Sequence, residues 1–343
     1  MKKVKAIVKR LFYFSMGVLN FKILREIADR NLLVINYHSI YDVDEDARIS
    51  KNIYRTEEEF EQDIVFLKKH YQFISLPQLL NYLQQGTKLP PNSVFLTFDD
   101  GLKVVYDKIR PILNKHQVSA AFFLNPSFVD NADLHFQRKK NLLQAKVKKN
   151  EIEAKKQKWK EIFLTVNIDT VNFHKGLKRV DFNRSYILNS LFELFEIDLE
   201  TYQKKNQIYL NSTEIEQMIS EGFVFGGHSM DHPNYDELSF GEQKKQTLDS
   251  IYWVRKKYDL VYSIFAFPLR DHNISQKLLK AIQSHCEVSF GVMGLGEDVF
   301  KNHIQRIDAE SNGASMIQVL KFEYLKYITR KIMGIQKFKR PVE

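Results

Sequence analysis

The sequence has few of the residues that cross-link or interrupt a chain. Its 343 residues include one cysteine, Cys286, eight prolines and thirteen glycines, and no internal repeat. A single cysteine excludes an intramolecular disulfide and a thiolate metal cluster, so any metal ligand must be His, Asp or Glu, and the protein fits a reducing compartment. With 44% hydrophobic residues, this composition excludes disordered and collagen-like chains and predicts a folded globular protein.

The sequence also lacks an apolar run long enough to span a bilayer. Basic residues 2–10 precede an apolar stretch at 11–19 that resembles a secretory signal in outline. Ser15 and Gly17 interrupt this stretch, no small-residue cleavage site follows, and a spanning helix needs about 20 apolar residues. We therefore expect residues 1–30 to form an amphipathic helical region, which lies either on a membrane or against the domain.

The net charge of +9 is concentrated in three segments. Residues 1–10 carry +5, residues 137–160 carry +8 and residues 326–343 carry +5, which leaves −9 on the rest of the chain. Such basic segments suit either a solvated lysine face or an anionic membrane surface, where each base contributes about 1 kcal/mol. We expect no nucleic-acid partner, because no binding motif accompanies the charge. The expected location is cytoplasmic, with peripheral contact at the inner membrane face through the amino terminus, the insert or the tail.

Short apolar runs alternate with helical patterns along the chain, which indicates a mainly parallel α/β sheet with crossover helices. Strands are expected at residues 32–37, 94–98, 120–124, 223–225, 263–267, 288–292 and 304–307. Capping boxes predict helix starts at Thr56 with Glu59, Thr213 with Glu216, and Ser239 with Glu242. Seven strands are consistent with a barrel or a large open sheet, and functional groups in such folds gather where strands end.

The alternation stops between residues 125 and 210. This lysine-rich segment has a helical pattern, in which apolar residues such as Trp159 form one packed face while Lys139 to Lys160 face water. We therefore expect a helical insertion at 125–210 that divides a domain made of residues 31–124 and 211–310. Residues 311–343 are expected to form a carboxyl-terminal helix and a basic tail.

Two adjacent carboxylates follow the expected strand at 94–98. Consecutive strand residues point to opposite sides, so the side chains of Asp99 and Asp100 cannot take the same position or the same role. Gly101 permits a sharp turn at the rim. Taken alone, an Asp-Asp-Gly sequence is more typical of an ordinary turn with an Asx hydrogen bond.

Two further strand ends carry residues suited to chemistry. His228 and His232 are four residues apart, so on one helical turn they can bind one ion, and a carboxylate from another strand would complete a catalytic ligand set with open positions. The alternative is a pair of surface or hydrogen-bonded histidines. Pro268 fixes the exit of the strand at 263–267, and the next amide could face a developing oxyanion, although a plain strand-ending proline is the default interpretation.

In this order, these residues resemble the polysaccharide deacetylase family, which shares the chitooligosaccharide deacetylase homology domain. Residues 97–101 read TFDDG and match the first family motif, and residues 228–232 match its His-Ser/Thr-x-x-His motif. The branch that deacetylates exopolysaccharides is also similar at residues 36–40, 109–113 and 265–268. The resemblance covers about residues 32–124 and 212–308. It implies a distorted (β/α) barrel with a helical insertion.

The resemblance also implies an activity: a metal-dependent hydrolase of non-peptide carbon–nitrogen bonds, which removes N-acetyl groups from an amino sugar in a polysaccharide or a lipid-linked glycan precursor. It implies that Asp100, His228 and His232 bind a divalent metal, usually zinc, and that Asp99 is the general base. Acetamides are poor electrophiles, so a Lewis acid and a carboxylate base are what their hydrolysis needs. The amide of Leu269 matches the family's oxyanion donor, where an aromatic residue is usual.

The sequence departs from the family at the late Leu-x-His motif that commonly supplies a general acid. Arg306 stands near that point and resembles an arginine that orients carboxylates in some relatives, but a guanidinium does not readily give up a proton. His303 or His38 could protonate the leaving amine instead. His38 ends the first strand at the expected rim, and the alternative is a structural histidine bonded to the backbone. We expect Pro268 and Arg306 on the substrate-binding side.

These departures leave two other functions open. One is a non-catalytic carbohydrate-binding or scaffold protein with a degenerate deacetylase fold. The other is a deformylase of a lipid-linked aminosugar.

Overall fold

A computed structural model describes residues 19–40, 54–310 and 314–342 of the chain. Most of the amphipathic region predicted for residues 1–30 lies outside the described residues, so its membrane contact stays a prediction. Its described part is helix α2 (Phe21–Ala28), which Asn20 caps and which packs against α15 (Met316–Ile332). Among the described helices, none combines the length and the apolar character needed to cross a membrane.

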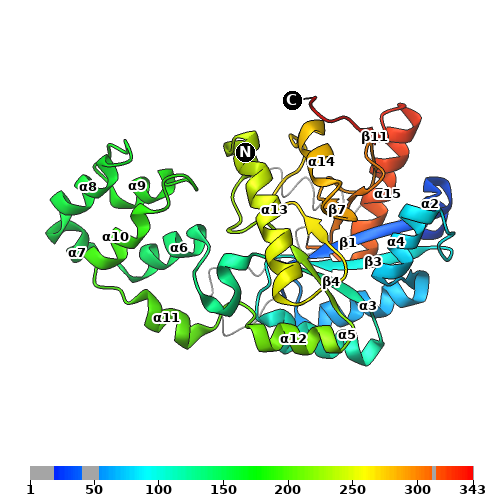
Figure 1. The fold of residues 1–343 in the computed structure, drawn as a ribbon, viewed down its shortest axis with the longest axis horizontal. Helices are drawn as coiled ribbons and strands as arrows, with labels where there is room; N and C mark the ends of the chain where they lie inside the picture. Colours follow the sequence, from blue (N-terminus) through cyan, green and yellow to red (C-terminus); the bar gives the residue numbers. More distant parts are fainter. Residues whose placement is uncertain (1–18, 41–53, 311–313, 343) are drawn as a thin grey trace.

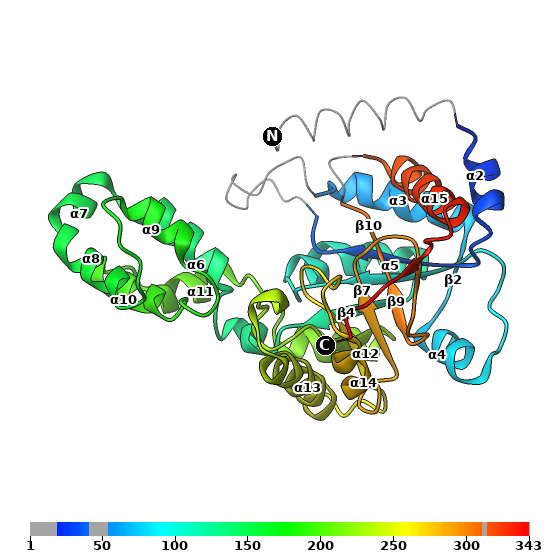
Figure 2. The same ribbon diagram turned by 90° about the horizontal axis from the view of Figure 1, so that it is seen from above.

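Parallel strands form a nearly closed ring in the larger, right-hand part of the molecule (Figures 1 and 2). Six neighbouring strands pair in the order β1 (Leu32–Tyr37), β3 (Ser93–Phe98), β4 (Ala120–Leu124), β5 (Val224–Gly227), β6 (Ile264–Ala266) and β7 (Val288–Gly291). The ring is completed by one segment, because β9 (His303–Gln305) pairs with β7 and β10 (Ile307–Asp308) pairs with β1. All seven expected strands are present, and the ring confirms the predicted distorted (β/α) barrel.

Helices cover the outside of this ring. They are α3 (Glu57–His70), α4 (Leu76–Gln85), α5 (Arg110–His116), α12 (Ser212–Ser220), α13 (Phe240–Lys257), α14 (Gln276–Ile282) and α15. The short strand β2 (Gln72–Phe73) pairs with β3, and β8 (Glu297–Asp298) pairs with β11 (Lys337–Phe338) of the tail. A π-helical turn at Val105–Ile109 and 3₁₀ turns at Pro126–Asn131 and Tyr235–Glu237 complete the connections.

Two of the three predicted capping boxes are confirmed, at the starts of α3 and α13. The prediction at Thr213 is wrong, because α12 begins earlier. Its cap is Asn211, whose side chain accepts a hydrogen bond from the amide of Glu214 at 2.9 Å, and the carboxylate of Glu214 accepts from the Asn211 amide at 3.0 Å. Asparagine caps a helix as well as threonine does, so the first of two possible caps begins the helix.

Strand alternation sorts the core into two sides. One cluster lies inside the ring and contains Val34, Phe95, Phe123 and Phe290. Residues that point to the other side of the strands, such as Phe98, pack in a second cluster with the outer helices. Each cluster follows the two-residue period of a strand. Polar groups at the carboxyl ends of the same strands therefore project into the barrel mouth.

The insertion is a separate bundle of short helices that projects from the barrel (Figures 1 and 2). The helices are α6 (Phe136–Lys146), α7 (Lys149–Ala154), α8 (Lys156–Leu164), α9 (Phe173–Arg179), α10 (Ile187–Leu194) and α11 (Leu199–Asn206). They enclose an aromatic core of their own, in which Trp159, Phe163 and Phe173 contact one another.

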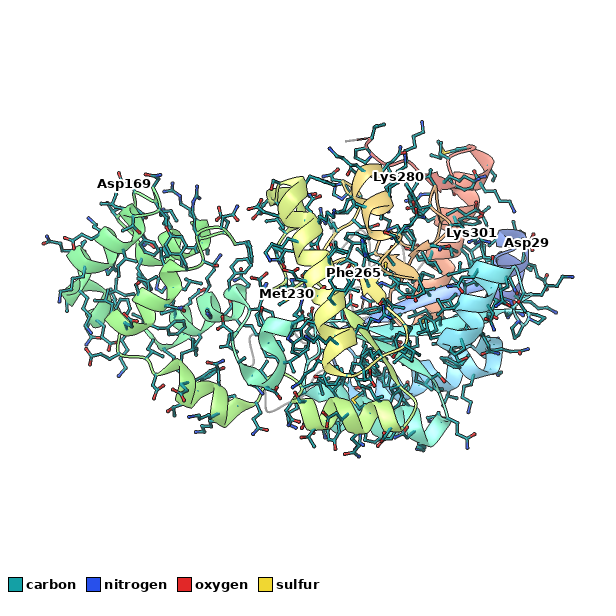
Figure 3. The ribbon with its side chains drawn as sticks, viewed as in Figure 1. Asp29, Asp169, Met230, Phe265, Lys280 and Lys301 are labelled. Carbon is teal, nitrogen blue, oxygen red and sulfur yellow. The ribbon has the colours of Figure 1, made fainter. Side chains whose placement is uncertain are left out.

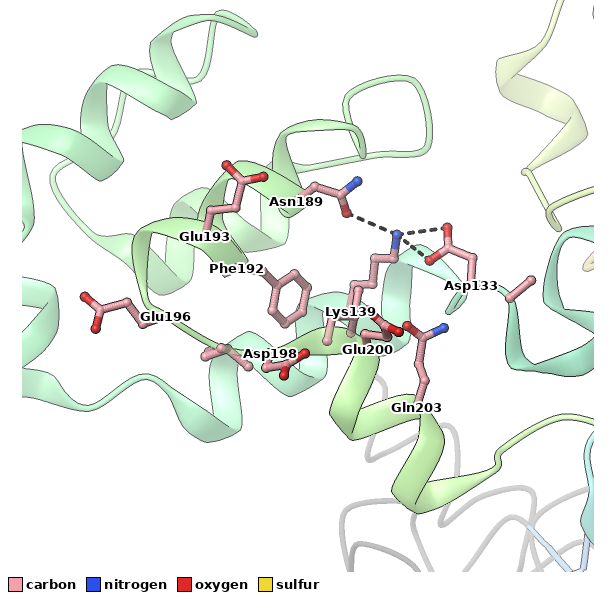
Figure 4. Close-up of a pocket in the computed structure, with 12 residues that line it drawn as sticks. Asp133, Lys139, Asn189, Phe192, Glu193, Glu196, Asp198, Glu200 and Gln203 are labelled. Carbon is pink, nitrogen blue, oxygen red and sulfur yellow. Dashed lines mark hydrogen bonds and ion pairs between the residues drawn. The ribbon is translucent and has the colours of Figure 1, made fainter.

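The expectation that the lysines of this segment face water is wrong for Lys139 and Lys140, which are buried. The ammonium group of Lys139 lies 2.7 Å from the carboxylate of Asp133 and donates to Asn189 at 3.2 Å (Figure 4). Lys140 donates to the carbonyl of Val180 at 2.6 Å. A lysine can be buried when its ammonium group is paired and its hydrocarbon stem packs, which a simple charge pattern does not reveal.

The two ends of the insertion are fastened beside the two motifs, one end at the Asp-Asp-Gly sequence and the other at residues 228–232. Leu102 forms an antiparallel bridge with Tyr209, and the amide of Leu210 donates to the carbonyl of Gly101 at 2.9 Å. At the other end, the amide of Ser127 donates a hydrogen bond to the carbonyl of Met230 at 3.0 Å. Figure 3 labels Met230 at the point where the insertion meets the barrel. The insertion therefore enters and leaves at the carboxyl ends of the strands.

Candidate active site

The two adjacent carboxylates leave β3 in different directions. Phe95, Thr97 and Asp99 share the inward face of the strand by alternation, and Asp99 is buried inside the barrel mouth. Asp100 has a φ of +73° and Gly101 a φ of +60°, so the chain turns sharply after Asp99. At Gly101 a Cβ atom would also lie 2.8 Å from the side chain of Leu124. This turn places Asp100 at the rim, where it is partly exposed.

The two histidines of the second motif lie in the loop that follows β5. The prediction of a shared helical turn is wrong, because Ser229 and His232 have φ values of +66° and +58°. The hydroxyl of Ser229 accepts a hydrogen bond from the amide of His232 at 3.1 Å, and Asn125 donates to the carbonyl of His228 at 2.6 Å. This compact loop brings the two imidazole rings to a centroid distance of 5.1 Å without a helix.

Asp100, His228 and His232 converge on one point. The Oδ1 atom of Asp100 lies 3.5 Å from Nε2 of His228 and 3.3 Å from Nε2 of His232, and one ligand atom from each residue lies within 4.8 Å of the others. Asp100 Oδ1 and His228 Nε2 are buried, and within the described part of the chain neither has a hydrogen-bond partner. Buried polar atoms without partners are uncommon in folded proteins, and here they fit a bound cation.

The protonation of these groups favours metal binding. Nδ1 of His228 lies 2.8 Å from the carbonyl of Ala266, which can only accept, so the proton is on Nδ1 and the lone pair of Nε2 faces Asp100. Burial lowers the pKa of His232 to about 3, against the opposing effect of Asp100, so this ring is neutral near pH 7. Burial would raise the pKa of Asp100, but the neighbouring histidines hold it well below its ordinary value.

Asp99 is held by a buried arginine. Nη1 and Nη2 of Arg306 donate to Oδ1 and Oδ2 of Asp99 at 2.7 and 2.8 Å, and Asn36 adds a hydrogen bond to Oδ2 at 3.1 Å. Although burial opposes the charge, Arg306 keeps the pKa of Asp99 below its ordinary value. Arg306 is 0% exposed, and substrate contact by this residue stays a prediction. Its guanidinium fixes the direction of the Asp99 carboxylate.

His38 forms a dyad with Glu310, a residue that sequence reasoning missed. Nδ1 of His38 lies 2.7 Å from Oε2 of Glu310, while Oε1 accepts from the amides of His38 and Ser39, both at 2.9 Å. The partner of the ring is thus a carboxylate and not the backbone. Burial lowers the pKa of His38, but the Glu310 carboxylate and the two aspartates raise it to about 10. Its Nε2 lies 3.9 Å from Asp99, and the side chain is 33% exposed.

His303 is in a different environment. Its ring is buried, with Nδ1 2.7 Å from the hydroxyl of Ser289 and Nε2 3.0 Å from the carboxylate of Asp271. Both nitrogens are used inside the protein, so the alternative that His303 protonates a leaving group is wrong.

The turn after β6 contains Pro268, which is buried, and Leu269, which is 55% exposed. Leu269 has a φ of +56°, a left-handed conformation that residues with a side chain seldom adopt. Strain of this kind is often found at functional sites. Oxyanion donation by the Leu269 amide and substrate contact by Pro268 stay predictions.

Comparison with known sequences agrees with the first of the two motifs. The family model described as polysaccharide deacetylase matches residues 86–172. A poly-beta-1,6-N-acetyl-D-glucosamine N-deacetylase of Staphylococcus epidermidis is 31% identical over 113 residues, which cover 30% of this chain and 39% of that protein. The protein of the same name from Staphylococcus aureus is 28% identical over 117 residues, covering 31% and 40%. The chain therefore matches about two fifths of the length of these relatives.

Solved structures share the fold over a larger part of the chain. The Streptococcus pyogenes deacetylase PplD, solved in complex with acetate, has a TM-score of 0.54 at 14% identity and covers 84% of this chain and 97% of its own. IcaB from Ammonifex degensii has a TM-score of 0.51 at 16% identity with the same coverage. The chain is thus similar to polysaccharide deacetylases in one matched segment of sequence and in the two motifs, and it shares the barrel fold of solved deacetylase structures.

Proposed function

We propose that the protein is a metal-dependent hydrolase that removes the N-acetyl group from an amino sugar in a polysaccharide or a lipid-linked glycan. The observation that carries this proposal is the convergence of Asp100, His228 and His232, with unbonded atoms facing one another, beside the ionised carboxylate of Asp99. The names of the relatives, deacetylases of an N-acetylglucosamine polymer, support the substrate class.

We propose zinc as the metal. A tetrahedral zinc with bonds of 2.0–2.1 Å separates its ligand atoms by about 3.4 Å. The distances from Asp100 Oδ1 to the two imidazoles, 3.5 and 3.3 Å, match this value. Three protein ligands leave a position open, as in catalytic zinc sites. A metal bound there would act as a Lewis acid toward the acetyl carbonyl and would acidify a water molecule.

Two residues beside the proposed metal site, Asp99 and His38, can carry out the two proton transfers of the reaction. Asp99 is charged and its direction is fixed by Arg306, so it can take a proton from the attacking water. His38 carries a proton at neutral pH because Glu310 stabilises its cationic form, so it can donate to the departing nitrogen. The base and the acid lie on adjacent strand ends, with Asp99 Oδ2 3.9 Å from His38 Nε2. This pair supplies the acid that the sequence motif lacks.

Replacement of a ligand tests the metal site. We expect His228→Ala to lose bound metal and acetate release, because only two of the three ligand residues, Asp100 and His232, would remain. Metal content after dialysis, measured by inductively coupled plasma mass spectrometry, checks this outcome. His272→Ala is the control, because His272 is exposed. Metal retained by His228→Ala at the wild-type level would contradict the ligand assignment.

The pH dependence tests the dyad. Glu310→Gln keeps the shape of the side chain but removes the largest of the charges that oppose the effect of burial on His38, so the pKa of His38 is expected to fall from about 10 toward its ordinary value of 6.5. Because the acid must be protonated, the alkaline limb of kcat/KM should move to lower pH, and the fold-loss of activity should grow with pH up to pH 10. Acetate release from pH 5 to 10 measures the shift.

A matched control for this variant is Glu61→Gln, which removes the carboxylate 2.7 Å from His116 on the surface. It should leave the profile unchanged. An unmoved alkaline limb in Glu310→Gln would exclude His38 as the acid.

The products separate the alternative functions. A protein that binds metal and glycan but releases neither acetate nor formate is a binding or scaffold protein. Release of formate in place of acetate indicates a deformylase.

A further inference from the structure

A small cavity of about 90 Å³ lies directly beside the three metal-ligand candidates. Asp100 and His232 form one side of it. The other side comes from the two ends of the helical insertion, through Phe128, His135, Arg138 and Tyr209. The insertion is therefore part of the barrel mouth and not only an appendage.

The residues from the insertion are fixed in place by one another. The rings of Phe128 and Tyr209 stack with centroids 5.0 Å apart, and the hydroxyl of Tyr209 accepts a hydrogen bond from the amide of His135 at 3.2 Å. The ring of His135 meets that of His232 edge to face at 5.1 Å. Arg138 follows on the first turn of α6, so its backbone position is set by this aromatic cluster.

Two buried polar atoms at the cavity have no hydrogen-bond partner among the described residues. The amide nitrogen of Asn125, which also lines the cavity, donates to two carbonyls at 2.6 and 3.1 Å, so its oxygen is oriented as an acceptor. Within the described residues, neither this oxygen nor Nε2 of His135 makes a hydrogen bond, and Asn125 is 2% exposed. Buried groups of this kind need hydrogen-bonding partners, which the hydroxyl groups of a sugar can supply.

Arg138 is the charged residue on the side of the cavity that the insertion forms. Its guanidinium lies 5.9 Å from the ring centroid of Tyr209, and within the described residues it makes no ion pair or hydrogen bond. The acid nearest in sequence, Asp133, is occupied by Lys139 at 2.7 Å, and Asp100 belongs to the proposed metal site. A partly exposed arginine with no acidic partner among the described residues can pair with an external anion, because its guanidinium stays charged and fits carboxylates and phosphates.

We propose that Arg138 binds an anionic group, a carboxylate or a phosphate, on the sugar that carries the scissile N-acetyl group or on its neighbour. This inference rests on the proposed deacetylase function and assigns the substrate to the acidic glycans. A guanidinium recognises planar carboxylates and phosphates through two parallel hydrogen bonds, and such contacts are about twice as strong as neutral ones. The insertion thereby selects the substrate, while the barrel supplies the reacting groups.

The test compares neutral and acidic ligands that share the N-acetyl group. The neutral ligand is a β-1,6-linked disaccharide of N-acetylglucosamine, and the acidic ones are glucuronic acid linked to N-acetylglucosamine and the 6-phosphate of the neutral disaccharide. Calorimetry with the full metal-loaded chain measures each Kd, and acetate release is measured in parallel. The wild type should bind at least one acidic ligand about tenfold more tightly than the neutral one.

Arg138→Gln should lose this preference while its affinity for the neutral ligand stays within about twofold, and Arg138→Lys should keep part of it. Lys146→Gln removes the same charge from an exposed position of the same helix and should change nothing. An equal loss on neutral and acidic ligands, or a wild type without preference, overturns the proposal. Preferential binding without acetate release from any ligand would instead leave this inference intact and refute the proposed activity.

Discussion

Asp99→Asn is expected to lower kcat for acetate release by about 100- to 10,000-fold, the usual contribution of a general base. An amide cannot take a proton from water, whereas the other groups of the site stay in place. Metal content should be unchanged, because Asp99 lies outside the proposed ligand set. Acetate assays paired with metal analysis of the same preparation measure both quantities.

Two further variants make this result specific. Asp100→Asn should lose metal as well as turnover, which separates the two neighbouring carboxylates by their roles. Asp107→Asn, a carboxylate with a side chain 46% exposed, should behave as the wild type. Wild-type turnover in Asp99→Asn would remove Asp99 from the mechanism.

Arg306→Met is expected to lower the free energy of unfolding by about 3–5 kcal/mol, because it leaves the buried carboxylate of Asp99 without its counter-charge. The side chain of Asp99 is only 2% exposed, so water cannot replace the guanidinium. Urea denaturation at pH 7.5 measures the loss. Arg110→Met breaks the more exposed ion pair of Arg110 with Glu221, and its expected cost is about 0–1 kcal/mol.

The loss of unfolding free energy in Arg306→Met should also depend on pH, and the pKa of Asp99 determines whether it grows or shrinks as the pH falls. In the wild type this pKa is below its ordinary value of 3.8, so the pair stabilises the fold above that pH and the contribution is lost as the pH falls through the lower, folded-state value. In Arg306→Met, burial dominates and raises the pKa of Asp99. The variant then gains relative stability on acidification, so the gap to the wild type should be smaller at pH 5 than at pH 8.

A double-mutant cycle separates the ion pair from simple packing. Adding Asp99→Asn to Arg306→Met removes the buried charge, so the double variant should be more stable than Arg306→Met alone. Strictly additive losses would show that the two side chains do not interact.

Local sequence signals were sufficient for most of the barrel. Buried parallel strands are continuous apolar runs, so all seven could be located, and the TFDDG sequence marked the strand end that carries the two carboxylates. The residues that converge on the metal site were also identified from their motifs. What these signals have in common is that each is contained in a few consecutive residues.

Features that depend on pairing across the fold could not be predicted in the same way. Glu310 reaches His38 because β10 pairs with β1, in the register Asn36 with Asp308, across 272 positions of sequence. The role of Arg306 depends on the same closure, since nothing near it in sequence indicates that it is buried. The loop around His232 uses left-handed backbone at non-glycine residues, for which the sequence carries no marker.

The segment that closes the ring also has a consequence for biosynthesis. The guanidinium that aligns Asp99 and the carboxylate that charges His38 both come from residues 306–310, which follow all six neighbouring strands of the ring from β1 to β7. A nascent polypeptide that has already formed its first six strands still has an unaligned base and an uncharged acid. Competence for the proposed hydrolysis is therefore expected only after residues 306–310 have been synthesised and have closed the ring, and a truncation before residue 303 should yield an inert product even if metal still binds.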